Sequence, residues 1–550
     1  MSIAGNEMSC AELLSAAESH LKKGELEAGE RALRSACIWT PSTPNGWYNL
    51  GVLERQRSAV GRAVSCLLRC LAVDPRHQQA GTNLGEALLA TGEDGRASMW
   101  IEHFTLQAPG HPAAWHNAGL DRSRRGDTRG ARSALMRAIA LNPAYGGALS
   151  ALGLICQNAA ENDMAAVCYQ RAIASGHSGG RNLINLGVIQ QESGQLEAAA
   201  AMYRLALQQN PGNFDVRANL AAVSLDLGQV PQAKAEARMV LTFRPDHSRA
   251  LWVSGWIQLL EGDFRRGYRA YDLAWRDALE TLPAHARSYP LWHGGPVPGG
   301  RVLLWCEHGV GDEILYAGML RDVMRTGVQA VVETDPRMVT LFQRSFPELE
   351  IIARGETIPA DVVAQSSTAR LPYLFRRRLA DFTATGPYLI PDPERIDWAR
   401  EVFSKLGAGA LVGLAWRSGN RRTSSGKSTR LSDWQPLLAR NDILPLSLQY
   451  DPGDESDERL YDNPALDIRD DIETLAAEIA VLDHVVSISG LTAHLAGALG
   501  RPGHVLLPRA PLWFWFAGGR RCPWYPSLSL VRQQTPGSWE REIAALTAEI

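Results

Sequence analysis

Small residues recur every 34 positions along the first half of the chain, between stretches that alternate apolar and polar residues with a helical period. Glycine occupies one recurring place, alanine a second and proline a third. The glycines stand at 51, 85, 119, 153, 187 and 255, the alanines at 63, 97, 131, 165, 199 and 233, and the prolines at 41, 75, 109, 143, 211 and 245. Small residues let two helices cross closely, and proline ends a helix. The spacing therefore predicts pairs of antiparallel helices.

A period of 34 residues with these markers is the pattern of the tetratricopeptide repeat. Seven full repeats run from about Cys10 to His247, and a degenerate eighth covers about Ser248 to Leu279. We assign residues 1–281 to the repeats. Such repeats stack into a right-handed superhelix with a concave binding face.

Asparagine recurs two positions before the repeat glycine, where a purely structural repeat does not require it. The five residues are Asn49, Asn83, Asn117, Asn185 and Asn219. Asparagine forms helices poorly, so its recurrence calls for an explanation. One interpretation is a ladder of amides that holds the backbone of an extended peptide, as in the repeats of O-GlcNAc transferases, which this arrangement resembles. The alternative is that each asparagine ties neighbouring repeats together.

The periodicity changes after a segment rich in proline and glycine, which we interpret as a linker or domain edge at residues 282–300. Short apolar runs then alternate with helical patterns. We expect strands at Val302–Trp305, Val328–Glu333, Leu411–Trp416, Val485–Ile488 and Gly503–Leu507. This alternation predicts parallel α/β sheets in two half-domains, residues 301–400 and 401–550, facing across a cleft.

Composition narrows the possible partners. The net charge of −3 gives no basic footprint for nucleic acid. No run of apolar residues is long enough to span a membrane, and no leader pattern stands at the first residues, so we expect a cytoplasmic protein. The eight cysteines lack the spacing of zinc ligands and are expected to be buried thiols.

Three stretches after expected strands carry candidate chemistry. In the first, Gly309 and Gly311 let backbone amides approach a ligand, and Asp312 opens a helix. The stretch lacks the lysine of a phosphate-binding Walker loop and the third glycine of a dinucleotide fingerprint. Asp312 alternatively serves only as a helix cap. Glu307 and His308 are fallback bases.

The second stretch is a loop dense in cations, glycine, serine and threonine. Its cations are Arg417, Arg421, Arg422, Lys427 and Arg430. This composition is typical of a mobile loop that closes on phosphate or carboxylate, although charged loops also occur simply as solvated surface.

The third stretch is Ser487 to Pro502, a strand end followed by a helix start. Gly490 permits close approach of an anion to the free amides of the helix, whose first turn holds Thr492 and His494. His494 then donates to the anion, or alternatively is a core histidine.

Together with Trp416, Gly419, Cys522-Pro-Trp-Tyr-Pro526 and Arg532-Gln533, these motifs resemble bacterial proteins that fuse tetratricopeptide repeats to a heptosyltransferase-like glycosyltransferase domain. The resemblance implies a GT-B fold of two Rossmann-like half-domains, a nucleotide-activated sugar held mainly by the second half, and no metal or other cofactor. It places Asp312 as the general base, and His494 with the start of its helix at the donor phosphate. Taken with the three stretches above, this predicts a donor site at Gly309, Gly311, Trp416, Arg417, Lys427, Arg430, Gly490, Thr492 and His494.

Two adjacent positions depart from the family, which usually has Asp-Thr where this chain has Ser489-Gly490. The departure implies another donor, such as a CMP-linked acidic sugar, or a weakened enzyme. We therefore expect a protein O-glycosyltransferase whose repeats capture a polypeptide; the resemblance suggests flagellin. The alternatives are a scaffold with a degenerate transferase domain and a transferase acting on surface glycan.

Overall fold

A computed structural model describes residues 10–550 except residues 178, 277–282, 284–286, 307–308, 383–385, 419–423, 451–454, 465–466, 468 and 536. The chain divides into two compact units, residues 1–189 and 190–550. This division does not coincide with the expected end of the repeats at 281, because the last repeats pack on the α/β region.

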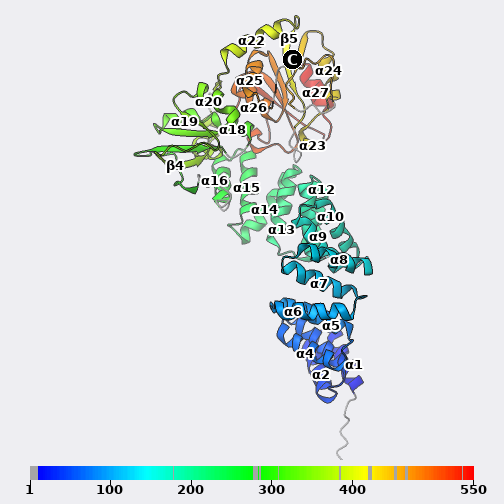
Figure 1. Ribbon diagram of the computed structural model, residues 1–550. Helices are drawn as coiled ribbons and strands as arrows, with labels where there is room; N and C mark the ends of the chain where they lie inside the picture. The colour runs from blue at the N-terminus through cyan, green and yellow to red at the C-terminus, as the bar shows by residue number, and fades with distance from the viewer. Residues whose placement is uncertain are drawn as a thin grey trace, which may run out of the picture. The chain divides into compact units, whose positions relative to one another are not determined.

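The first unit consists of paired helices that stack in chain order (Figure 1). They are α1 (Cys10–Lys22) with α2 (Leu26–Trp39), α3 (Pro44–Gln56) with α4 (Val60–Val73), α5 (Gln78–Thr91) with α6 (Asp94–Gln107), α7 (Pro112–Arg124) with α8 (Thr128–Leu141), α9 (Gly146–Asn158) with α10 (Asn162–Ala174), and most of α11 (Gly180–Glu192).

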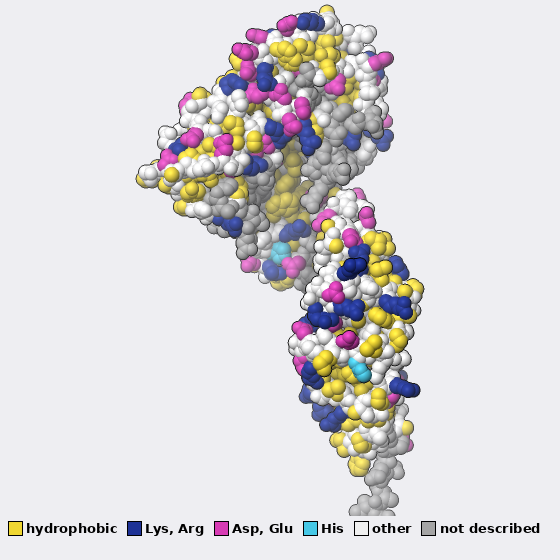
Figure 2. Space-filling model, viewed as in Figure 1, with side chains coloured by type: hydrophobic (Ala, Val, Ile, Leu, Met, Phe, Trp, Pro, Cys, Tyr) yellow, Lys and Arg dark blue, Asp and Glu magenta, His cyan; other side chains and the backbone are white. Residues whose placement is uncertain are grey.

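The repeated small residues lie where the helices cross. A methyl group at Gly119 of α7 would come within 2.6 Å of Leu135 on α8, and the repeated alanines Ala63, Ala97, Ala131 and Ala165 are fully buried. Side chains of both charges and apolar side chains are interspersed over the face of this unit that Figure 2 shows.

The second unit begins with the remaining helices of the repeats. They are α12 (Leu196–Gln209), α13 (Phe214–Asp226), α14 (Val230–Phe243), α15 (Ser248–Leu260) and α16 (Phe264–Arg276). Phe264 and Tyr268 of α16 pack edge-on against Phe516 and Trp513 respectively, and the Ala517 amide donates to the Leu260 carbonyl at 3.0 Å. This aromatic packing explains why the last repeats belong to the same compact unit as the sheets.

Two parallel sheets follow, as the alternating pattern predicts. The first has the strand order β3-β2-β1-β4, with β1 (Arg301–Trp305), β2 (Ala330–Thr334), β3 (Glu350–Ala353) and β4 (Val362–Ser367). The second has the order β6-β5-β7-β8-β9, with β5 (Ala410–Ala415), β6 (Ile443–Ser447), β7 (His484–Ile488), β8 (Gly503–Leu507) and β9 (Leu528–Arg532). The strands read as nearly continuous apolar runs because helices cover parallel sheets.

Helices and short turns connect these strands. They include α18 (Val310–Ala317), α19 (Leu320–Arg325), α20 (Val339–Ser345), α21 (Leu371–Phe375), α22 (Pro393–Ser404), α23 (Ser424–Lys427), α24 (Gln435–Leu438), α25 (Ile472–Val481), α26 (Leu491–Ala498) and α27 (Glu540–Thr547), with the 3₁₀ turns η2 (Pro336–Met338), η3 (Thr368–Arg370), η4 (Leu379–Phe382), η5 (Leu431–Trp434) and η6 (Trp513–Trp515).

Two expected boundaries differ from the structure. The boundary at 400/401 falls inside α22, which Asp392 caps at its start and which packs on α25. The expected linker is a domain edge, since the Trp292 amide donates to the Gln365 carbonyl at 2.7 Å and the Trp292 side chain is buried. Burying an aromatic side chain fixes this segment on β4.

Candidate functional site

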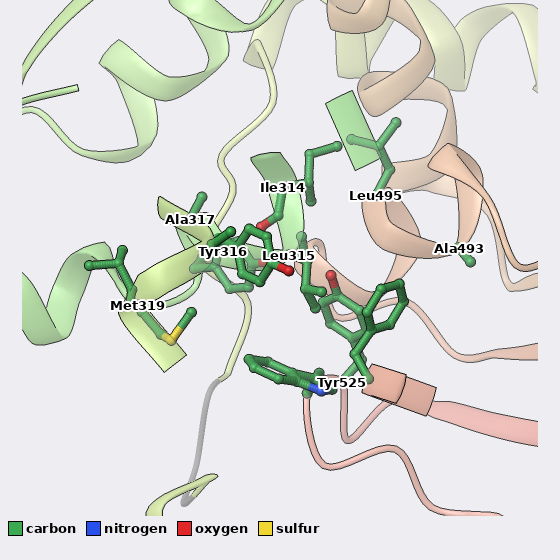
Figure 3. Close-up of a cluster of buried hydrophobic side chains, with 14 of the residues drawn as sticks. Ile314, Leu315, Tyr316, Ala317, Met319, Ala493, Leu495 and Tyr525 are labelled. Atoms are coloured by element: carbon green, nitrogen blue, oxygen red, sulfur yellow. The ribbon is translucent and has the colours of Figure 1, made fainter. Parts of the chain in front are cut away.

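Two helix starts, one from each sheet, meet in the second unit. Helix α18 follows β1 and helix α26 follows β7, and the two helices pack against each other. Ile314 and Leu315 of α18 lie in the same buried cluster as Leu495 of α26 and Tyr525 (Figure 3). Ligands of open α/β sheets bind outside the carboxyl ends of the strands. The structure thus brings two of the sequence-predicted stretches together at the place where this rule expects a ligand.

Gly311 of α18 lies close to His494 of α26. A methyl group at Gly311 would come within 3.1 Å of His494 Cδ2, and the α-carbon of Leu491 lies 3.8 Å from the same point. Gly311 therefore allows the first turns of the two helices to touch.

Lys427 from the cationic loop joins these helix starts. Its Nζ donates to the carbonyl oxygen of Ser489 at 3.1 Å, directly after β7. Burial lowers the pKa of Lys427, and the nearby carboxylate of Asp312 opposes that shift. A cation and a carboxylate thus share the space between the two sheets, with Asp312 in the first turn of α18 and only partly buried.

Asp312 is held in place by the residue that follows it. Glu313 is buried and accepts hydrogen bonds from the Thr334 hydroxyl at 2.5 Å and the Asp335 amide at 2.9 Å, and it pairs with Arg354 at 2.6 Å. Burial raises the pKa of Glu313, while these partners oppose the shift. The network anchors the start of α18 to the end of β2, and sequence reasoning did not single it out.

His494 does not fit the role of a charged donor to an anion. Its side chain is only 4% exposed, stacks on Trp515 with ring centroids 5.3 Å apart, and shares a hydrogen bond of 3.0 Å between Nδ1 and the Tyr525 hydroxyl. Burial lowers the pKa of His494 to about 3, and Lys427 adds to that effect. The alternative of a core histidine is therefore the better description, with a tyrosine as its partner.

Tyr525 extends this contact toward α18. It is hydrogen-bonded to Tyr388, whose hydroxyl donates to the Ile314 carbonyl at 2.7 Å. His494 is thus connected through two buried tyrosines to the helix that carries Asp312. Tyr525 belongs to the Cys522–Pro526 motif, which was the available sequence signal for it.

The structure shows what the side chain of Ser489 contacts at the position where the family usually has aspartate. The Ser489 hydroxyl accepts a hydrogen bond of 2.7 Å from the indole nitrogen of Trp515. The side chain at this position therefore binds the protein's own aromatic cluster. Gly490 precedes α26 in an extended conformation, with φ −163°.

The other residues predicted to bind the nucleotide-sugar donor differ in their exposure to solvent. Trp416 is 1% exposed, and its indole nitrogen donates to Glu455 at 2.7 Å, so it is a core residue and not a stacking surface for a donor. Thr492 is buried, whereas Gly309, Arg417 and Arg430 are exposed. Among the described candidates, Gly311, Asp312, Lys427, Gly490 and His494 lie at the meeting point of the helices.

The five asparagines do not form a uniform ladder. Asn117 is 1% exposed, and its Nδ2 donates to the Thr82 carbonyl of the preceding repeat at 3.0 Å, so it cannot hold a peptide. Asn185 donates to the Tyr169 hydroxyl at 3.0 Å, and Asn219 accepts from Arg249 at 2.6 Å. The alternative that asparagines tie helices together therefore holds for Asn117, and the exposed Asn49 and half-buried Asn83 remain candidates for a partner.

Several predictions fall on parts of the chain that the structure does not describe, namely Glu307, His308, Gly419, Arg421 and Arg422. Within the described ranges, no group of three or more histidine, cysteine or carboxylate side chains is arranged to hold a metal ion. The helices in those ranges include none with both the length and the apolar character needed to cross a membrane. The described cysteines after Cys10 are buried free thiols, as expected.

Comparison with known protein families supports the interpretation of the repeats. The tetratricopeptide repeat family matches residues 191–252. The chain carries tetratricopeptide repeats. Repeats of this class indicate a protein partner.

Protein FlbA from Caulobacter vibrioides is 27% identical over 318 residues, and the match covers 52% of this chain and 52% of FlbA. The chain thus spans about half the length of this relative. Among solved structures, the Cut9–Hcn1 complex is 17% identical with a TM-score of 0.38, covering 46% of this chain and 49% of that chain. Pseudomonas aeruginosa PilF is 17% identical with a TM-score of 0.33, covering 38% and 94% of the respective chains.

Proposed function

We propose that this protein is an O-glycosyltransferase that moves a sugar from a nucleotide-activated donor to serine or threonine of a polypeptide. The observation that carries the proposal is the meeting of the starts of α18 and α26, with Asp312 and Lys427 between two parallel sheets. Helix starts favour anions because their first amides lack partners within the helix. A base and an anion site side by side suit transfer from a nucleotide donor.

In the proposed reaction, Asp312 takes the proton of the acceptor hydroxyl as the oxygen forms a bond to the sugar carbon. The bond from that carbon to the donor phosphate breaks, and the phosphate leaves with the electron pair. Lys427 and the amides at the helix starts stabilise its charge. Neutral His494 supports the geometry by packing against Gly311.

The repeats supply the polypeptide in this proposal. Tetratricopeptide repeats bind protein partners, and exposed Asn49 with half-buried Asn83 offers amide groups to an extended backbone. Flagellin is the acceptor that the family resemblance suggests. A non-catalytic scaffold is the competing function, and the Ser489-Gly490 departure is the observation that favours it.

The test combines a binding screen with a transfer assay. Purified protein is heated with UDP-, GDP-, ADP- and CMP-linked sugars, since a specific ligand raises the unfolding temperature by mass action. We expect one nucleotide class to stabilise the protein, and Asp312→Asn to keep that stabilisation while losing transfer to the acceptor. Absence of any nucleotide effect would favour the scaffold, and full activity in Asp312→Asn would remove Asp312 from the mechanism.

A further inference from the structure

A cavity lies between the last repeat helix, α16, and α21, and none of its lining residues belongs to the candidate site at the starts of α18 and α26. Its volume is about 400 Å³, and it is lined by Phe264, Arg265, Tyr268, Arg269, Tyr373 and Arg377. A space of this size lies in the range of small-molecule sites. Three of its six lining residues are arginines, so the cavity carries a concentration of positive charge.

The arginines that line this cavity differ from their neighbours in sequence. Arg266 pairs with Asp263 at 3.5 Å, Arg376 with Asp322 at 2.7 Å, and Arg378 with Asp381 at 2.9 Å. In contrast, no carboxylate from the described ranges pairs with Arg265, Arg269 or Arg377. The neighbouring cations are thus neutralised. Arg377 uses its Nε to donate to the Tyr373 carbonyl at 3.2 Å, and among the described residues no hydrogen bond or ion pair occupies the terminal guanidinium nitrogens of the three arginines that line the cavity.

Tyr268 also lines the cavity, but its hydroxyl group is not offered to a ligand. The residue is 3% exposed, and its hydroxyl oxygen is buried, with no hydrogen-bond partner among the described atoms. Burial raises the pKa of Tyr268 well above its usual range, so the hydroxyl keeps its proton and adds no negative charge beside the arginines.

The aromatic side chains of the cavity do not offer a stacking surface. The guanidinium groups of Arg370 and Arg377 lie 5.4 and 5.8 Å from the centroid of the Tyr373 ring, and Phe264 is 2% exposed. The cavity therefore selects for charge and hydrogen-bond acceptors over flat rings.

We propose that this cavity is a binding site for a small phosphate-class anion, held by Arg265, Arg269 and Arg377. Arginine is the side chain best suited to phosphate because its planar group donates two parallel hydrogen bonds. Three such cations match a dianion or polyanion better than a single carboxylate. The site is separate from the proposed transferase site and stands whether or not that function holds.

The experiment measures binding of inorganic pyrophosphate to the full chain by calorimetry at constant ionic strength, with inorganic phosphate and acetate as further probes. We expect pyrophosphate to bind more tightly than acetate. The double variant Arg269→Gln/Arg377→Gln should weaken pyrophosphate binding at least tenfold.

Two controls separate this site from other sources of binding. Arg266→Gln changes another exposed arginine on the same helix that does not line the cavity, and this variant should bind pyrophosphate within twofold of the parent protein. Lys427→Met removes the cation of the other candidate anion site, so pyrophosphate binding that persists in this variant and is lost when Arg269→Gln/Arg377→Gln is added belongs to the cavity. Unchanged binding in the double variant, complete loss of binding in Lys427→Met alone, or no binding by the parent protein would each overturn the proposal.

Discussion

Gly311 and His494 touch across the two sheets of the second unit, so closely that a methyl group at Gly311 would lie 3.1 Å from the imidazole. The imidazole cannot easily retreat, because it stacks on Trp515 and is hydrogen-bonded to Tyr525. Gly311→Ala should therefore lower the free energy of unfolding by about 1–3 kcal/mol, as overpacking usually does. It should also reduce transfer by displacing Asp312, which follows directly. Chemical denaturation and the transfer assay measure the two effects.

Gly309→Ala is the matched control. Gly309 stands two residues earlier, and a methyl group there would meet nothing within 4 Å. This variant should keep the stability and activity of the parent protein. Equal effects of the two substitutions would show that the contact with His494 does not limit the site.

The sequence predicted the larger part of the fold because periodic patterns depend on local geometry. The 34-residue spacing located the paired helices, and five apolar runs located β1, β2, β5, β7 and β8 to within about two residues. Strands β3, β4, β6 and β9 were not predicted. β3 has only four residues, and β6 contains Pro445, so neither gives a clear pattern.

The sequence predicted where the backbone of the candidate site lies, but not which of its side chains are buried. Gly311 and Gly490 each follow a strand, and parallel strands bring such turns to one edge. The burial of His494 depends on Trp515 and Tyr525, which come from distant parts of the chain. The burial of Asn117 likewise depends on the preceding repeat. A motif identifies these residues without showing which way each side chain points.

The buried histidine gives a prediction about pH. The pKa of His494 is about 3 in the folded protein and near 6.5 when the chain is unfolded, so the unfolded state binds one more proton between these values. The contribution of the neutral imidazole to the free energy of unfolding has its full value above pH 6.5. Below that pH it falls by about 1.4 kcal/mol per pH unit. His494→Gln should show a correspondingly shallower loss of stability between pH 6.5 and 5, measured by urea denaturation. Parallel curves for the two proteins would contradict a neutral buried His494.

The asparagines divide into structural and candidate binding residues, and paired variants test that division. Asn117→Ala removes a buried hydrogen bond to the Thr82 carbonyl and should lower the free energy of unfolding by about 1–2 kcal/mol. Asn49 is exposed, so Asn49→Ala should change stability by less than about 0.5 kcal/mol and weaken binding of an acceptor peptide. Thermal unfolding and peptide titration measure these effects. A stability loss in Asn49→Ala, or none in Asn117→Ala, would reverse the assignment.

Lys427 provides the sharpest test of the proposed anion site. Its ammonium group is half-buried and makes one described hydrogen bond, to the Ser489 carbonyl, which places the charge beside the start of α26. Lys427→Met should leave folding close to normal, because it removes a charge that burial disfavours. It should weaken binding of the stabilising nucleotide at least tenfold, because the charge opposite the donor phosphate is lost.

The control and the pH response of this variant complete the test. Arg430→Gln removes an exposed cation of the same loop and should bind the nucleotide within about threefold of the parent protein. Nucleotide binding by the parent protein should decline as the pH rises, because Lys427 loses its charge. Burial lowers the pKa of Lys427, so this decline should occur at a lower pH than it would with an ordinary lysine. That decline should be absent from Lys427→Met. Equal binding by Lys427→Met and the parent protein at neutral pH would place the nucleotide elsewhere on the chain.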